Sequence, residues 1–396
     1  MNYEKLSGAF LYVRPDSFFY NYQRGECPVK LIHCADLHLD SAMTTHLSKE
    51  KAQERKAELL RTFERMVEYA RENEVEAILI AGDLFDRKNV SATARKSVRQ
   101  AIEENEQITF YYLQGNHDEN FSAAEEQSLP VNLKQFGEEW RNYVREEDGK
   151  RLVISGLELT KENAGYASHS LSLNLKDFNI VMLHGQESEH ESRDRTEVIP
   201  LSHMRNKGID YLALGHVHTY KKKRLDSRGT YCYAGCLEGR GFDECGEHGF
   251  VLLDIDLQQG TYSCEFVPFA YRNLYEVAVD ISGCMNTSGI MRRIEERLQL
   301  LSYDKRHLLR IVLQGMVDIE CEKNLDYLVN WLKDGYYFVR IRDNSGIRVD
   351  YDSFAADISL KGEFVRTVRA GEDMSEEDKG AIIRFGIQAL AGEEIG

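Results

Sequence analysis

From residue 29 onward, short apolar runs alternate with longer stretches of helical periodicity, and this alternation restricts the fold more than any other feature. The apolar runs predict buried strands at residues 29–34, 77–80 and 108–113. The stretches between them, residues 48–73 and 91–105, predict helices. Strands that are connected by helices run parallel, in a sheet whose faces the helices cover. The sequence therefore predicts an α/β fold.

After about residue 150 the pattern changes from alternating elements to successive strands. One further helix is expected near residues 200–207. The strands are predicted at residues 152–155, 178–183, 211–214, 230–234 and 250–255. Two packed sheets with helices on the outside would accommodate this order of elements.

A chain of 396 residues is long for a single core, so more than one domain is expected. The predicted parts are an N-terminal extension at residues 1–28, a main domain at 29–268, a smaller α/β domain at 269–350 and a C-terminal tail at 351–396. The main boundary is placed near Pro268, and the tail carries an amphipathic helix at residues 375–391.

Five short polar motifs stand at the ends of predicted strands or in the loops that follow them. They are Asp36-Leu37-His38, Gly82-Asp83, Gly115-Asn116-His117-Asp118, His184-Gly185 and Gly215-His216-Val217-His218. Each motif alone is typical of an ordinary turn. Because ligands bind at the carboxyl ends of strands in open α/β sheets, the combination predicts one site. Mixed nitrogen and oxygen donors suit Mn²⁺, Fe²⁺ or Zn²⁺ better than Ca²⁺.

This ordered set of motifs resembles the signature of the calcineurin-like metallophosphoesterases. Within that superfamily the chain is similar to the SbcD/YhaO-like branch of DNA-repair exonucleases, and residues 33–41, 82–86 and 213–218 carry the closer likeness. The resemblance covers roughly residues 29–268. It implies a four-layer α/β/β/α sandwich with a smaller C-terminal α/β capping domain.

The resemblance also implies a role for each polar residue and a cofactor of two divalent metal ions. Manganese is the expected metal, with iron and zinc as alternatives. The first ion would be bound by Asp36, His38 and His218, the second by Asn116, His184 and His216, and both by Asp83. His117 would be the catalytic residue, which steadies the phosphate or protonates the leaving oxygen.

Two features near these motifs concern the substrate. Many nuclease relatives have a second histidine three residues after the bridging aspartate, and this chain has Asp86 there. The stretch 235–244 resembles the glycine-rich loop of the family, and Arg240 within it is a candidate phosphate contact, with a solvated surface turn as the alternative. Lys221 and Lys222 are candidate contacts to a DNA backbone, with a solvated hairpin arm as the alternative.

Composition limits the class of protein. The sequence has no run of 18 apolar residues that would predict a membrane span, and its first thirty residues lack a secretory signal. The eight cysteines show no framework spacing, which indicates reduced thiols and a cytoplasmic location. A net charge of −16 argues against a general nucleic-acid binder, although bound metal ions would supply positive charge at the site.

Three functions are compatible with these observations. The first is a DNA exonuclease or endonuclease of DNA repair that works with an SMC-like coiled-coil ATPase, which could dock on the helix at residues 375–391, and a homodimer is a further option. The second is a phosphodiesterase or phosphatase acting on nucleotides or other small phosphoesters, which the acidic charge favours. The third is a non-catalytic scaffold subunit, against which the complete ligand set argues.

Overall fold

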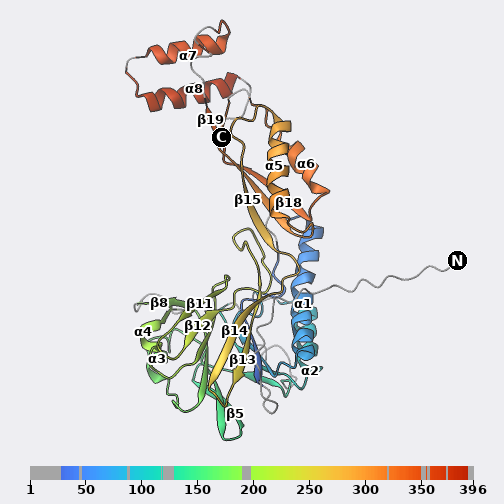
Figure 1. Cartoon of the computed structure of the whole chain (residues 1–396), viewed down its shortest axis with the longest axis vertical. Coiled ribbons are helices and arrows are strands. Elements are labelled where there is room, and N and C mark those ends of the chain that lie inside the picture. The colour runs from blue at the N-terminus through green and yellow to red at the C-terminus, as the bar shows by residue number, and fades with distance from the viewer. Residues whose placement is uncertain are drawn as a thin grey trace, which may run out of the picture.

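The computed structural model places two packed sheets at one end of an elongated molecule, a smaller α/β unit beyond them and a pair of helices at the far end (Figure 1). It describes residues 28–43, 47–86, 90–116, 118, 129–189, 198–318, 321–348, 354, 357–371 and 373–390. The predicted N-terminal extension therefore lies outside the described residues up to residue 27. Among the described residues, no helix is long and apolar enough to cross a bilayer.

The first sheet contains the strands that the alternating pattern predicts. Its six strands have the order β14-β13-β1-β2-β3-β4. They are β1 (Val29–Cys34), β2 (Ala77–Ala81), β3 (Thr109–Leu113), β4 (Leu133–Gln135), β13 (Gly249–Asp256) and β14 (Thr261–Pro268). Strands β1 to β4 pair in parallel, whereas β13 is antiparallel to β1. The parallel part of the fold is confirmed.

Two helices, α1 (Lys49–Glu72) and α2 (Ala92–Glu103), cover the outer face of this sheet. Each begins where the sequence provides a capping hydroxyl, because Ser48 accepts from the N–H of Lys51 and Ser91 from that of Ala94. Side chains such as Phe63 and Val98 are buried against the sheet.

The second sheet has six strands in the order β11-β12-β10-β7-β6-β5. They are β5 (Arg141–Glu147), β6 (Lys150–Gly156), β7 (Phe178–His184), β10 (Tyr211–Gly215), β11 (Lys221–Arg224) and β12 (Thr230–Tyr233). Apolar side chains from both sheets form a common core between them. The short helices α3 (Ala167–Ser170) and α4 (Leu201–Met204) pack on the outer face, which completes the α/β/β/α sandwich.

The smaller unit is a parallel three-stranded sheet with helices and a core of its own. Its main elements are β15 (Leu274–Asp280), α5 (Thr287–Leu301), β16 (Leu308–Gln314), α6 (Leu325–Lys333) and β18 (Phe338–Asp343). Two short two-stranded sheets complete the fold. One pairs β17 (Met316–Asp318) with β19 (Gly346–Arg348). The other, in the part of the chain that forms the sandwich, pairs β8 (Gln186–Ser188) with β9 (Val198–Pro200). The exact division into domains stays a prediction.

Arg272 joins this unit to the sandwich just before β15. Its Nε donates to Glu58 Oε1 of α1 over 2.9 Å, and its Nη1 donates to the carbonyl of Arg306 over 2.8 Å. Its guanidinium also stacks 3.5 Å from the centre of the Tyr337 ring. Lys51 donates to the carbonyl of Tyr337. The N-terminal half of α1 therefore supports the smaller unit (Figure 1).

The C-terminal part holds two helices where the sequence predicted one. The predicted helix is α8 (Glu376–Leu390), and the missed one is α7 (Leu360–Ala370). The two pack together around Val365 and Ile383. Helix α7 was missed because its apolar positions are few and interrupted by charged residues, so its short buried face becomes evident only against α8.

Candidate metal centre

The polar motifs meet at one edge of the sandwich, where strands of both sheets end. Backbone hydrogen bonds join the loops, since the N–H of Asp36 donates to the carbonyl of Gly82 and that of His38 to the carbonyl of Asp83. Strand β10 continues into the loop of His216, whose N–H donates to Asp36 Oδ1 over 2.9 Å. The structure therefore brings together motifs that lie up to 180 residues apart.

Several of these residues have a backbone conformation that is rare outside glycine. Asp36, His38 and Asp83 have φ values of 51°, 44° and 52°, and His216 has 96°. Residues held in such conformations cost about 1–3 kcal/mol each and cluster at functional sites. Here the surrounding loops hold them, which turns the side chains toward a common point.

Two glycines allow the sheets to approach each other at the site. A Cβ on Gly82, which has φ +93°, would lie 2.1 Å from Nδ1 of His184. A Cβ on Gly215 would lie 1.9 Å from the carbonyl oxygen of Ala81. No side chain fits at these distances, so glycine is required at both positions.

The first cluster consists of Asp36, His38 and His218, each of which offers one ligand atom within 4.8 Å of the others. The Nε2 atoms of His38 and His218 lie 3.2 Å apart. Asp36 and His38 are buried. This group can hold one metal ion.

The second cluster consists of Asp36, Asp83 and His184, with ligand atoms again within 4.8 Å of one another. The Oδ1 atom of Asn116 lies 3.2 Å from Nε2 of His184. The ring of His216 stands edge-on to that of His184, with 5.4 Å between the centroids. All the side chains predicted as metal ligands therefore lie near these two clusters.

The outer ring nitrogens show how the histidines are oriented. Nδ1 of His184 lies 2.9 Å from the carbonyl oxygen of Ala81, and Nδ1 of His218 lies 2.6 Å from Glu244 Oε1. An oxygen acceptor at Nδ1 keeps the proton there and leaves the lone pair of Nε2 directed inward. Inward-facing Nε2 atoms and carboxylate oxygens then have a cation as their natural common partner, so the donor set fits a metal ion.

The electrostatics agree with this reading. Burial raises the pKa of Asp36 and the neighbouring Asp83 raises it further, while His184 and His218 lower it. Burial lowers the pKa of His184, but the hydrogen bond and charge of Asp83, with the charge of Asp36, raise it to about 9. The buried carboxylates thus attract positive charge strongly, and a divalent cation supplies it.

The sequence interpretation missed two acidic residues at this site. Glu244 orients His218, and although burial opposes ionisation, His218 and Arg240 hold the pKa of the Glu244 carboxyl well below its ordinary range. Asp118 accepts from the N–H groups of Phe85 and Gly115 over 2.8 and 3.0 Å, and so braces two metal-site loops. Asp118 is the last residue of the motif at residues 115–118, although no role was predicted for it. For Glu244 the sequence offers only its place in the glycine-rich stretch 235–244.

His117 is the predicted catalytic residue and Arg240 a predicted phosphate contact. His117 lies outside the part of the chain that the structure describes. Arg240 Nη1 donates to Asp86 Oδ1 over 3.1 Å, and its Nη2 donates to Glu244 Oε1 over 2.9 Å. Its assignment as a phosphate contact stays a prediction.

The lysines of β11 lie on the edge of the second sheet. Lys221 pairs with Glu187, and Lys222 donates to the carbonyl of Cys264 over 2.8 Å. Lys222 and Lys223 are exposed. Because β11 pairs with β12 along its length, these residues form a regular edge strand, and their contact to DNA stays a prediction.

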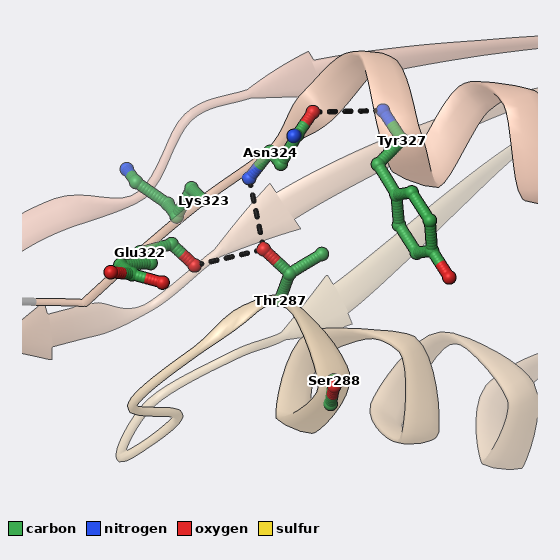
Figure 2. A pocket seen from close by; sticks show the side chains of 6 residues that line it. All are labelled: Thr287, Ser288, Glu322, Lys323, Asn324 and Tyr327. Atoms are coloured by element: carbon green, nitrogen blue, oxygen red, sulfur yellow. Dashed lines mark hydrogen bonds between the residues drawn. The ribbon is translucent and has the colours of Figure 1, made fainter.

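A separate pocket of about 510 Å³ lies in the smaller unit, between the N-termini of α5 and α6 (Figure 2). Thr287 Oγ1 donates to the carbonyl of Glu322 over 3.1 Å and accepts from the N–H of Asn324 over 3.0 Å. Asn324 Oδ1 in turn accepts from the N–H of Tyr327 over 2.9 Å. Asn324 caps α6, and Thr287 ties the start of α5 to the segment before α6, so the polar groups here have structural roles apart from the clusters at the strand ends.

Comparisons with known proteins agree with the geometry. A family model described as calcineurin-like phosphoesterase matches residues 29–220. The uncharacterized metallophosphoesterase YhaO of Bacillus subtilis (strain 168) is 30% identical over 302 residues, which are 72% of this chain and 71% of that protein. The DNA double-strand break repair protein Mre11 of Methanopyrus kandleri is 26% identical over 292 residues, 67% of this chain and 62% of that protein. The protein of the same name from Sulfolobus acidocaldarius is 26% identical over 310 residues, 74% of this chain and 76% of that protein.

Proposed function

Because this chain belongs to the calcineurin-like metallophosphoesterases, hydrolases that cleave phosphoester bonds at a divalent dimetal centre, we propose that it is a DNA nuclease. One observation carries the proposal. The basic strand β11 begins three residues after His218 and leads away from the metal clusters along the edge of the second sheet. A phosphate backbone that follows this strand would reach the clusters. Relatives named as DNA double-strand break repair proteins support the same substrate.

We assign the ligand roles as follows. Asp36, His38 and His218 would hold one ion, Asn116, His184 and His216 the other, and Asp83 both. Manganese is the ion proposed, since the set mixes imidazole with carboxylate and amide oxygen. When bound, the two ions would neutralise phosphate charge and lower the pKa of a water nucleophile.

The protein itself supplies orientation and proton handling. The carbonyl of Ala81 and the carboxylate of Glu244 fix the rings of His184 and His218 before substrate arrives. Asp118 accepts from the N–H of Gly115 and so braces the start of the loop that carries Asn116. We propose that His117 steadies the scissile phosphate and protonates the departing oxygen.

A partner would give such a nuclease access to DNA ends. We propose an SMC-like coiled-coil ATPase, with α8 as the docking helix. Ile382 and Phe385 of α8 are 40% and 42% exposed, whereas Ile383 and Ile387 are buried against α7. The exposed apolar side chains give a partner helix something to cover. A homodimer is the alternative assembly.

A small phosphoester is the second candidate substrate. Two observations favour it: the net charge of −16, and Asp86 at the position where many nuclease relatives have histidine. An acidic surface repels a long polyanion more than a single phosphate group.

The deciding experiment compares substrates under one condition. The full chain is incubated with Mn²⁺ and labelled duplex DNA, single-stranded DNA, cyclic nucleotides or an aryl phosphodiester. Cleavage of DNA that is lost in Asp83→Ala and His117→Ala supports the nuclease. If only the small esters are cut, the DNA proposal fails and the small-phosphoester function replaces it.

A further inference from the structure

We infer that Arg240 is a positioning residue for the first metal site: it holds Asp86 and Glu244, the two carboxylates that orient His38 and His218. The inference rests on the proposed ligand roles of these histidines. It assigns to Arg240 a task inside the protein, distinct from contact with a substrate phosphate.

One arm of the arrangement runs through Glu244 to His218. Glu244 Oε2 accepts from the backbone N–H of Arg240 over 2.7 Å, and Oε1 accepts from Nη2 of Arg240 over 2.9 Å. The same Oε1 atom lies 2.6 Å from Nδ1 of His218. With both oxygens engaged and the side chain buried, Glu244 has little freedom to turn away from His218.

The other arm runs through Asp86 to His38. Asp86 Oδ1 accepts from Nη1 of Arg240 over 3.1 Å and lies 3.4 Å from Nδ1 of His38. His38 is itself buried, with 1% exposure. Asp86 is the residue that departs from the histidine of many nuclease relatives, so this arm follows from the departure.

A single guanidinium suits this task better than two separate cations. It is planar, always charged and has donors at fixed angles, so it can fix the relative positions of two carboxylates on different loops. It also offsets the repulsion between Asp86 and Glu244. The outer nitrogens of both histidines then face carboxylates whose places are set by one group, and their Nε2 atoms meet 3.2 Å apart.

The segment that carries Arg240 is also held from the smaller unit. Arg310 Nη2 donates to the carbonyl of Phe242 over 3.0 Å, and its guanidinium lies 5.0 Å from the centre of the Phe242 ring. A cavity of about 170 Å³ at this junction is lined by Arg240 and Phe338 among others. Contacts from the smaller unit therefore hold the segment two residues after Arg240.

The test is metal affinity measured without substrate. Mn²⁺ is titrated into the EDTA-treated and dialysed full chain and into Arg240→Met, followed by calorimetry and by the paramagnetic resonance of free Mn²⁺. We expect one of the two sites to weaken by about 10- to 100-fold, the usual effect of removing an outer-shell partner. Arg240→Lys keeps the charge but loses the fork of donors, and should recover part of the affinity.

A matched variant separates positioning from general stability. Arg228→Met removes a guanidinium of similar exposure, since the side chain of Arg228 is 31% exposed and that of Arg240 is 20% exposed. Nη2 of Arg228 lies 2.7 Å from Asp210 Oδ2, and neither residue belongs to the metal clusters. It should bind Mn²⁺ as the wild type does. If Arg240→Met does not fold, Arg240→Lys and Glu244→Gln decide, and each should weaken one site.

The outcomes are distinguishable. The positioning role is overturned if Arg240→Met binds Mn²⁺ at both sites with wild-type affinity, even if DNA is cut. If Arg240→Met does not fold, wild-type affinity in both Arg240→Lys and Glu244→Gln overturns it. A weakened site with a wild type that binds two ions but cuts no DNA supports the positioning role and removes the proposed substrate.

Discussion

The Nε2 atoms of His38 and His218 lie 3.2 Å apart, although 180 residues separate them in the chain. Their outer nitrogens face Asp86 and Glu244, which leaves both inner lone pairs directed at the same small volume. Two lone pairs so placed repel each other unless a proton or a cation lies between them. The geometry therefore links the stability of the folded chain to what binds there.

Asp83→Asn should reduce the gain in folding stability that metal binding gives. The variant removes a carboxylate with 1% exposure whose ligand atom lies within 4.8 Å of those of Asp36 and His184, so the site should lose much of its affinity for a cation. Bound ions at 1,000 times their Kd add about 4 kcal/mol per site to the wild type. Most of this gain should be lost in the variant, as measured by thermal unfolding with and without Mn²⁺.

A surface aspartate provides the control for that measurement. Asp226, in the turn between β11 and β12, accepts from backbone N–H groups and lies outside both metal clusters. Asp226→Asn should keep the full response to Mn²⁺. An unchanged response in Asp83→Asn would contradict a bridging role for that carboxylate.

Gly82→Ala should damage the site through a steric clash with His184 in addition to backbone strain. The new Cβ would lie 2.1 Å from Nδ1 of His184, and the alanine would have to adopt the φ of +93° that Gly82 has. Gly149→Ala is the matched control, because φ is +77° there and nothing lies within 4 Å of the new atom. The control should cost about 1–2 kcal/mol of stability from backbone strain alone. Gly82→Ala should cost more and should also weaken Mn²⁺ binding, measured by urea unfolding and calorimetry.

Much of this site was predictable because each proposed ligand lies at the end of a strand or within four residues after it. A strand end fixes both the position and the direction of the next residues, so the combination of motifs at strand ends, together with the family resemblance, singled out Asp36, Asp83 and His184. Glu244 was not, because its role depends on a contact with His218 that only the folded chain creates. Helix α7 was missed for a similar reason, since its buried face is defined by α8.

Glu158→Gln should change how stability depends on pH. Burial raises the pKa of Glu158 to about 7; the N–H of Gln114 partly opposes this, and Asp118 adds to it. The folded state then binds the proton more tightly than the unfolded chain, so this group lowers stability as pH rises from about 4.5 to about 7. The variant should match the wild type near pH 4.5 and exceed it at pH 8, measured by urea unfolding in EDTA. Equal differences at both pH values would contradict the assignment.

Lys222→Ala combined with Lys223→Ala tests the path along β11. Both side chains are exposed on the edge strand that leads from His218. If they neutralise DNA phosphates, the slope of log affinity against log salt should fall by about 0.9 for each contact. Binding to duplex DNA is measured in EDTA by fluorescence anisotropy. Lys150→Ala, at the start of β6 on the far side of the same sheet, should leave the slope unchanged.

Arg272→Ala should weaken the junction between the sandwich and the smaller unit. Arg272 and Glu58 are both buried, and their Nε–Oε1 bond of 2.9 Å joins the segment just before β15 to α1. Removal of Arg272 leaves the buried charge of Glu58 with Arg55, whose Nη1 donates to Glu58 Oε2 over 2.5 Å. Breaking a buried pair in this way costs about 3–5 kcal/mol, which urea unfolding can measure.

The control for this junction is an ion pair of the same type in water. Arg71 and Glu68 lie 3.3 Å apart on α1, with side chains 53% and 58% exposed. Solvent screens such a pair, so Arg71→Ala should cost at most about 1 kcal/mol. The ratio of the two losses, rather than either value alone, measures how much burial strengthens the contact. Similar losses in both variants would mean that Arg272 is no more important to the fold than a surface arginine, and that contacts such as Lys51 with Tyr337 hold the smaller unit in place.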